Sequence, residues 1–126
     1  MLVIPDVLFN ENKSELIIKN MYKLYRININ DIYYLEKCCR KIEIVLKDNP
    51  ISFYGSFIQI EKMLTASNFF KCHKSYIVNC NKVFMIDKDE ITFEDINEHA
   101  YVSREYKNEL FEKLEPKEYN SRCSAN

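Results

Sequence analysis

The fold is decided by one stretch, which reads Phe69-Phe70-Lys71-Cys72-His73-Lys74-Ser75-Tyr76-Ile77-Val78-Asn79. Two aromatic residues lead into a short polar and basic interruption, and a run of β-forming residues follows. This pattern predicts two strands joined by a tight turn. The basic and polar side chains expected at the turn are Lys71, His73, Lys74 and Ser75. Several hydrogen-bond donors on a rigid turn suit an anionic partner, so nucleic acid is the first candidate.

The length of 126 residues fits one domain with a single core. The chain has a single glycine, which excludes glycine-rich phosphate-binding loops. No apolar stretch approaches the length of a membrane span, and no charged-then-apolar leader opens the chain. These features predict a cytoplasmic protein that does not contact membranes.

The charge of the chain is unevenly distributed, although the net charge is only −1. Residues 1–82 carry 12 Lys and Arg against 8 Asp and Glu, whereas residues 83–126 carry 6 against 11. A locally basic half can bind phosphate while an acidic half faces elsewhere. The distribution therefore permits a nucleic-acid partner without requiring one.

Five cysteines are present, and two of them, Cys38 and Cys39, are adjacent. An odd number with an adjacent pair argues against a disulfide framework and favours reduced thiols. Cys72, His73 and Cys80 lack the paired spacing of a zinc site, so we expect no metal and no cofactor. Cys38 or Cys39 is a candidate redox-sensing thiol if it is exposed.

Many short strands and two small helices are expected between residues 15 and 115. The segment Glu36-Lys37-Cys38-Cys39 is expected to connect two strands, and Ser56 is expected to cap an amphipathic helix. Ser103 is expected to cap a second helix, Arg104 to Leu114. Residues 1–14 are assigned to a loose lead-in and residues 116–126 to a frayed tail.

Four segments of the chain, in matching order and spacing, resemble LytTR-type DNA-binding domains. They are Ile29–Glu36, similar to a DIxYxE segment; Tyr54–Phe57, similar to a strand-to-helix junction; Phe70–Asn79, similar to the family's most recognisable block; and Tyr101–Tyr106, similar to its C-terminal vSRxY segment. The resemblance covers residues 15–114, which is nearly the whole globular part.

The resemblance implies a mainly β fold, an elongated antiparallel arrangement of short sheets stacked lengthwise with about two small flanking α-helices. It also implies a bacterial transcription regulator that reads double-stranded DNA through loops. Members of the family typically form the C-terminal output domain of two-component response regulators and bind paired direct repeats in promoters. Two copies are therefore expected side by side on DNA.

Three loops carry the DNA contacts in that family. The corresponding residues here are Lys37, Arg40 and Lys41 in the first loop, Lys71, His73, Lys74 and Ser75 in the second, and Arg104 and Glu105 in the third. Arg40 is expected to donate two hydrogen bonds to a guanine, the alternative being a solvated cation. Lys74 is a flexible point charge and is expected on a phosphate rather than a base.

His73 has two interpretations, a hydrogen bond near the DNA backbone or a structural bond to backbone carbonyls in its own turn; the structural one is favoured. Ser75 and Asn79 are expected to satisfy local backbone groups.

Glu105 departs from the family pattern, because many members carry a second Arg or Lys at this position, immediately after the one that corresponds to Arg104. A carboxylate there either accepts a hydrogen bond from a cytosine or leaves the contact to Arg104 alone.

Two alternatives stay open for how the regulator is controlled. If the chain is an excised output domain, a receiver domain outside it supplies phosphorylation control; if it is a stand-alone regulator, control comes from expression level, partner binding or thiol chemistry. The competing function is an adaptor or antagonist with the same fold that binds a partner protein and no DNA. An enzyme is not expected, because two histidines and no nucleophile or carboxylate-pair motif give no candidate for catalysis.

Overall fold

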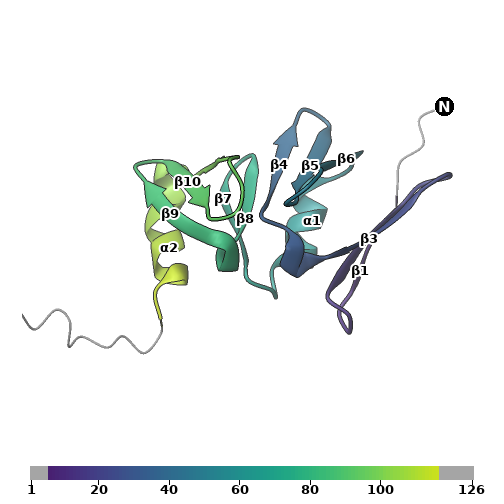
Figure 1. Ribbon diagram of the computed structural model, residues 1–126, viewed down its shortest axis with the longest axis horizontal. Helices are drawn as coiled ribbons and strands as arrows, with labels where there is room; N and C mark the ends of the chain where they lie inside the picture. Colours follow the sequence, from purple (N-terminus) through teal and green to yellow (C-terminus); the bar gives the residue numbers. More distant parts are fainter. Residues whose placement is uncertain (1–5, 117–126) are drawn as a thin grey trace, which may run out of the picture.

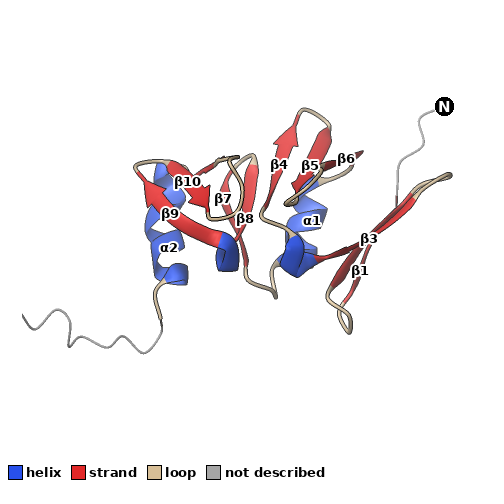
Figure 2. Ribbon diagram, viewed as in Figure 1, coloured by secondary structure: helices blue, strands red, loops and turns tan. Residues whose placement is uncertain are grey.

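The computed structural model describes residues 6–116 and has the mainly β architecture that the sequence predicts. Three antiparallel sheets follow one another along the long axis of the molecule, and two α-helices pack against them (Figure 1, Figure 2). The strands are β1 (Asp6–Asn10), β2 (Glu15–Lys19), β3 (Leu24–Asn28), β4 (Tyr34–Cys38), β5 (Lys41–Val45), β6 (Ile51–Tyr54), β7 (Phe69–His73), β8 (Tyr76–Asn79), β9 (Val83–Asp87), β10 (Glu90–Phe93) and β11 (Ala100–Tyr101). The helices are α1 (Phe57–Leu64) and α2 (Arg104–Leu114), with short 3-10 turns at Ile29–Asp31 and Cys80–Lys82.

The central sheet has five strands in the order β6-β5-β4-β8-β7. Successive side chains of a strand point to opposite faces, and both faces of this sheet are covered. Leu35 and Ile77 pack into a core shared with α1 and the β1-β2-β3 sheet. Tyr34 and Val78 pack into a second core shared with α2 and the β11-β10-β9 sheet. The central sheet thus separates two hydrophobic cores and serves as the rigid support for its own connecting turns.

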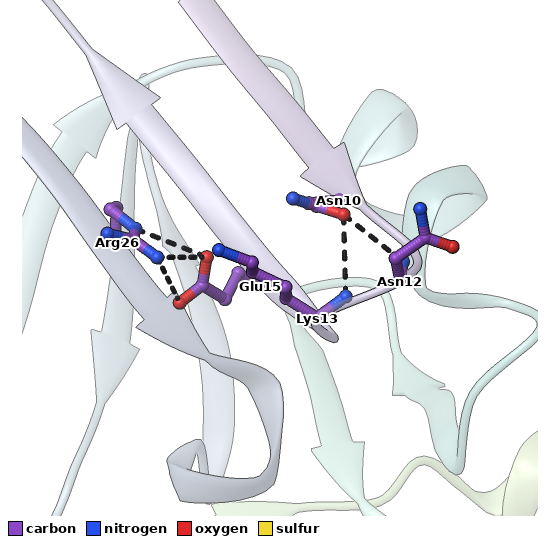
Figure 3. Close-up of polar contacts among 5 residues, drawn as sticks. All are labelled: Asn10, Asn12, Lys13, Glu15 and Arg26. Carbon is purple, nitrogen blue, oxygen red and sulfur yellow. Dashed lines mark hydrogen bonds and ion pairs between the residues drawn. The ribbon is translucent and has the colours of Figure 1, made fainter.

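The first strand corrects the expectation that residues 1–14 form a loose lead-in. β1 pairs with β2 over its full length, and Val7 is buried in the first core. Asn10 accepts hydrogen bonds from the backbone N–H groups of Asn12 and Lys13 and so closes the β1–β2 turn (Figure 3). Residues 6–14 are therefore part of the folded unit.

The outer face of the β1-β2-β3 sheet carries an ion pair between neighbouring strands. Arg26 on β3 donates to both carboxylate oxygens of Glu15 on β2, at 3.1 to 3.2 Å (Figure 3). Arg26 is more than half exposed, so this pair contributes little to stability. The opposite face of the same two strands supplies the buried residues Leu16 and Ile27.

Helix α1 begins as predicted, because Ser56 accepts a hydrogen bond from the backbone N–H of Gln59 at 3.2 Å. The only glycine of the chain, Gly55, precedes this cap. A Cβ atom on Gly55 would lie 2.9 Å from a ring carbon of Phe53 and 3.6 Å from Ile42. Glycine suits this position because the Phe53 ring would have to shift to make room for a Cβ atom.

Helix α2 has the predicted bounds, Arg104 to Leu114. Ser103 occupies the N-cap position, but it makes no side-chain capping bond; its hydroxyl donates to the carbonyl of Cys72 at 3.4 Å. In place of the expected cap, the Ser103 hydroxyl forms a hydrogen bond that joins the start of α2 to β7. The sequence places Tyr106, Leu110, Phe111 and Leu114 on one apolar side of this helix; Leu110 is fully buried, whereas Phe111 and Leu114 are exposed.

Strand boundaries differ from expectation at the first predicted loop. β4 continues through Glu36, Lys37 and Cys38, which were expected to be a connection. The pairing of β4 with β5 and β8 extends the strand, so only Cys39 and Arg40 remain as the turn. The predicted C-terminal tail lies outside the described residues from position 117 onward.

Candidate nucleic-acid interface

The three predicted loops lie at one end of the central sheet. The β4–β5 turn, the β7–β8 turn and the start of α2 all reach the upper edge of the view (Figure 1). Backbone hydrogen bonds connect them: Lys37 N–H donates to Ser75 C=O at 2.8 Å, and Ser103 N–H donates to Cys72 C=O at 2.9 Å. Residues far apart in the sequence therefore form one continuous edge.

The first loop is a two-residue turn, Cys39–Arg40, between the paired residues Cys38 and Lys41. Cys39 has φ of 59°, a left-handed conformation that tight hairpin turns require and that glycine or asparagine adopts more easily. Arg40 is exposed, and its carbonyl accepts a hydrogen bond from Gly55 N–H at 3.4 Å. The turn therefore presents the Arg40 side chain at the end of a well-anchored hairpin.

Two further cations flank that arginine. Lys37 and Lys41 are both exposed, and the Lys41 ammonium group lies 5.4 Å from the centre of the Tyr54 ring. Because Lys37 and Lys41 flank the turn near the ends of β4 and β5, the first loop concentrates three positive charges. Such a cluster raises the local concentration of anions.

The second loop is the Lys74–Ser75 turn between β7 and β8. His73 Nδ1 accepts a hydrogen bond from the backbone N–H of Ser75 at 3.0 Å, and its ring packs edge-on against Tyr76. His73 therefore has a structural role in its own turn, as favoured, but its ring accepts a hydrogen bond from a backbone amide and was expected to bond backbone carbonyls. This bond leaves Nε2 as the nitrogen that carries the proton when the ring is neutral.

Lys74 is exposed at the tip of that turn. Asn79 behaves as predicted, because its side chain donates to the Ile32 carbonyl at 2.9 Å and accepts from Asn81 N–H at 3.0 Å. Ser75 takes part through its backbone, which bonds His73 and Lys37. The turn is therefore held by the His73 ring and by the Ser75 backbone, and Lys74 is an exposed cation with no ion-pair partner among residues 6–116.

The third loop begins α2. Arg104 and Glu105 are both exposed in the first turn of the helix. A carboxylate at this position interacts favourably with the positive end of the helix dipole. This gives Glu105 a role within the fold that needs no contact with a base.

A cavity of about 580 Å³ lies between the second and third loops. His73 and Arg104 line it together with two lysines that the motifs did not identify, Lys88 and Lys107. Lys88 sits in the two-residue β9–β10 turn with φ of 60°, and Lys107 lies one helical turn after Arg104. Asp89 also lines this cavity, so the local field is mixed but predominantly positive.

Lys71 is the predicted site residue that the structure separates from the edge. Its ammonium group lies 3.8 Å from the Glu61 carboxylate and 6.0 Å from the centre of the Phe57 ring, both on α1. The side chain is three-quarters buried. Lys71 therefore faces α1, whereas the other eight predicted residues lie on the three loops or immediately beside them.

The four cysteines among residues 6–116 differ in exposure: Cys38 and Cys39 are exposed, Cys80 is partly buried and Cys72 is buried. Burial raises the pKa of the Cys72 thiol to about 12. Local desolvation and the neighbouring Glu36 carboxylate raise the pKa of the exposed Cys38 thiol, which also donates a hydrogen bond to Glu36 at 3.5 Å. A raised pKa lowers the fraction of each of these thiols that is present as thiolate, the form that reacts with oxidants. Among residues 6–116, no group of three or more His, Cys, Asp or Glu side chains is placed to hold a metal ion.

Tyr76, the first residue after the second loop, packs against residues on both of its sides. Burial raises the pKa of Tyr76, and the nearby Glu36 carboxylate raises it further. Tyr76 also packs against Tyr101 of β11, with ring centres 5.7 Å apart.

The helices within residues 6–116 are all too short or too polar to cross a membrane.

Comparison with known proteins agrees with this arrangement. A family model described as the LytTr DNA-binding domain matches residues 22–115. The fold resembles a solved LytTr DNA-binding domain of a putative methyl-accepting/DNA response regulator from Bacillus cereus, with a TM-score of 0.65, 24% identity, and coverage of 81% of this chain and 97% of that one. At this identity the likeness concerns the fold.

Curated relatives match a shorter segment. Accessory gene regulator protein A of Staphylococcus aureus strains N315 and MW2 is 29% identical over 80 residues, which cover 61% of this chain and 33% of that protein. The chain thus spans about a third of the length of the curated relatives it matches. Because the family model covers most of the chain and the folds agree, this chain belongs to the family of LytTr DNA-binding domains.

Proposed function

We propose that the chain is part of a bacterial transcription regulator that binds double-stranded DNA in a sequence-dependent manner through the edge formed by the three loops. Two copies bind side by side on paired direct repeats in a promoter. A receiver domain outside this chain, such as response regulators carry, controls the occupancy of the site. A chromosomal target implies a cytoplasmic protein.

The observation that carries this proposal is the convergence of cations on one edge. Lys37, Arg40 and Lys41 come from the first hairpin, Lys74 from the second and Arg104 from α2. The backbone bonds between the loops fix their spacing. Fixed cations suit both phosphate contacts, which supply affinity, and base contacts, which supply specificity.

Within this edge we assign different roles to different cations. Arg40 reads a base, since its planar fork matches the two acceptors of guanine. Lys37, Lys41, Lys74 and Arg104 contact phosphates. His73 orients the second loop and offers its Nε2–H to the DNA backbone.

Selection from random double-stranded DNA, followed by sequencing, tests the proposal. The expected outcome is enrichment of a short motif that occurs twice in the same orientation. A gel-shift series on the enriched DNA should show affinity that falls steeply as salt rises, because phosphate contacts release counterions. Folded protein that enriches no sequence and binds no DNA at low salt would contradict the proposal. Co-purification with a regulator protein in that case would identify an adaptor.

A further inference from the structure

A second cavity, of about 490 Å³, lies beside the first loop where β6 meets α1. We call it the β6–α1 groove. Its walls are mainly apolar and are formed by Val7, Tyr54, Phe57 and Ile58. Ile58 is 61% exposed and Tyr54 is 43% exposed, although both are large apolar side chains. Exposed apolar surface that is concave and continuous marks a binding site more often than a convex surface does.

Two cations stand at the rim of this groove. Lys37 and Arg40 line it and are exposed. The ion pairs found among residues 6–116 are Glu15–Arg26, Glu61–Lys71 and Glu90–His99, so neither rim cation has a carboxylate partner within that part of the chain. The groove thus combines an apolar wall with two exposed cations that have no carboxylate partner among residues 6–116.

We propose that the β6–α1 groove binds a small amphipathic monocarboxylate, a molecule with one carboxylate on an alkyl or aryl group. The apolar group lies against Tyr54 and Ile58, and the carboxylate lies between Lys37 and Arg40. A volume of this size falls within the range of small-molecule sites in proteins. Charge complementarity selects an anion, and the apolar wall selects against a simple hydrated anion such as phosphate.

Such a ligand regulates DNA binding, an inference that rests on the proposed function of Arg40. One guanidinium group cannot pair with a ligand carboxylate and with a guanine at the same time. Ligand and DNA therefore compete, and by linkage each lowers the affinity of the other by the same factor. The groove is an effector site built into the DNA-reading edge.

The direct test is a titration followed by backbone amide NMR, with 4-phenylbutyrate as the probe and 4-phenylbutanol as its neutral counterpart. We expect saturable shifts at residues 39–40 and 54–59 with the carboxylate. The alcohol should bind roughly fivefold more weakly, because it keeps the apolar contact and loses the exposed charge contacts. Equal affinity for both compounds, or shifts spread over the whole surface without saturation, would overturn the proposal.

A pair of variants separates the groove from other apolar surface. Ile58→Asn makes the wall polar at an exposed position, and Leu24→Asn makes the same type of change at an exposed position on the β1-β2-β3 sheet. We expect Ile58→Asn to weaken 4-phenylbutyrate binding at least severalfold and Leu24→Asn to leave it unchanged. Equal effects of the two variants would count against the groove.

A DNA competition experiment distinguishes this proposal from the proposed function. 4-Phenylbutyrate should lower the DNA affinity of the wild-type protein and have little effect on Ile58→Asn. If the protein binds no DNA at all but the NMR titration saturates at the groove, the proposed function fails while the ligand site stands. If DNA binds and the ligand does not saturate, the ligand site is wrong.

Discussion

Arg40 owes its exposed position to the residues around it. Cys39 takes the left-handed conformation that turns the hairpin, and Gly55 N–H bonds the Arg40 carbonyl from behind. Cys39 and Gly55 carry no charge, but both hold the backbone of Arg40 and so orient its side chain toward solvent. The residue proposed to read DNA and the residues that position it are therefore different.

Replacing Arg40 by alanine should reduce discrimination between the preferred and a non-preferred site by about 1–3 kcal/mol, the worth of a bidentate base contact. Arg40→Lys is the matched control, since it keeps the charge and loses the fork. We expect it to lose discrimination and to retain most of the non-specific affinity. Competition gel shifts with both DNAs measure the difference; equal weakening on every sequence would make Arg40 a phosphate contact instead.

Gly55→Ala should destabilise the protein by about 1–3 kcal/mol, the usual cost of overpacking a filled core. The added methyl group would overlap the ring of Phe53, which is buried and cannot move away freely. Urea unfolding measures this, with Gln59→Ala on the exposed side of α1 as the control. An unchanged midpoint for Gly55→Ala would show that the β6–α1 junction is looser than its geometry indicates.

Cys72 should resist alkylation in the folded protein. Burial raises the pKa of this thiol to about 12, so almost no thiolate is present at pH 8. Iodoacetamide should modify the peptide that holds Cys38 and Cys39 while the Cys72 peptide stays unmodified, as read by mass spectrometry. The same reaction in denaturant is the control and should modify all of them; rapid labelling of Cys72 in folded protein would contradict its burial.

Among the elements, the edge proposed to bind DNA consists of three loops joined to the central sheet by backbone hydrogen bonds. The first loop is bonded to the second through Lys37 and Ser75, and the third is bonded to β7 through Ser103 and Cys72. Because these hydrogen bonds join backbone atoms, a substitution on a loop changes the side chain that the loop presents and keeps the distance between the loops. The loops can therefore diverge in sequence preference while the fold stays the same.

Two lysines extend this edge beyond the predicted residues. Lys88→Gln and Lys107→Gln should each weaken DNA binding by a similar factor on all sequences and reduce the salt slope by about one, as the loss of a phosphate contact does. Lys62→Gln, in the last turn of α1, is the matched control. An unchanged salt slope in the first two variants would confine the interface to the three motif-bearing loops.

How far the sequence predicts these elements depends on whether their signals are local. α1 and α2 were predicted because an N-cap serine and an apolar stripe lie within the helix itself. β1 was missed because Val7, Leu8 and Phe9 are all apolar, which hides the alternation of a strand with one buried face. Lys88 was missed because its approach to Arg104 depends on tertiary packing, which no local pattern reports. Lys107 lies one helical turn after Arg104, a local spacing from which it could have been found.

At the scale of the whole molecule, the central sheet joins two cores, and phenol and thiol groups are buried in or beside the second. Burial raises the pKa values of Tyr34 and Tyr76 above the ordinary 10 and that of Cys72 above the ordinary 9. A raised folded-state pKa means that the unfolded chain releases protons first as pH rises. These groups therefore stabilise the fold fully below about pH 9 and progressively less above it.

The free energy of unfolding should fall as pH rises from about 9 towards 12, in the window set by those shifts. Urea unfolding between pH 8 and pH 11 measures the slope. Tyr76→Phe should reduce that slope, since it removes one titrating group and keeps the ring contacts. A free energy that does not change over this range would mean that the second core is open to solvent.

We propose that DNA binds along the edge formed by the three loops. Backbone amide NMR of the protein with and without its selected DNA tests this most directly. We expect the largest shifts at residues 37–41, 73–75, 88 and 103–107, and small shifts in the β1–β2 turn at the opposite side of the fold. Large shifts centred on the β1-β2-β3 sheet, with the three loops unchanged, would contradict it.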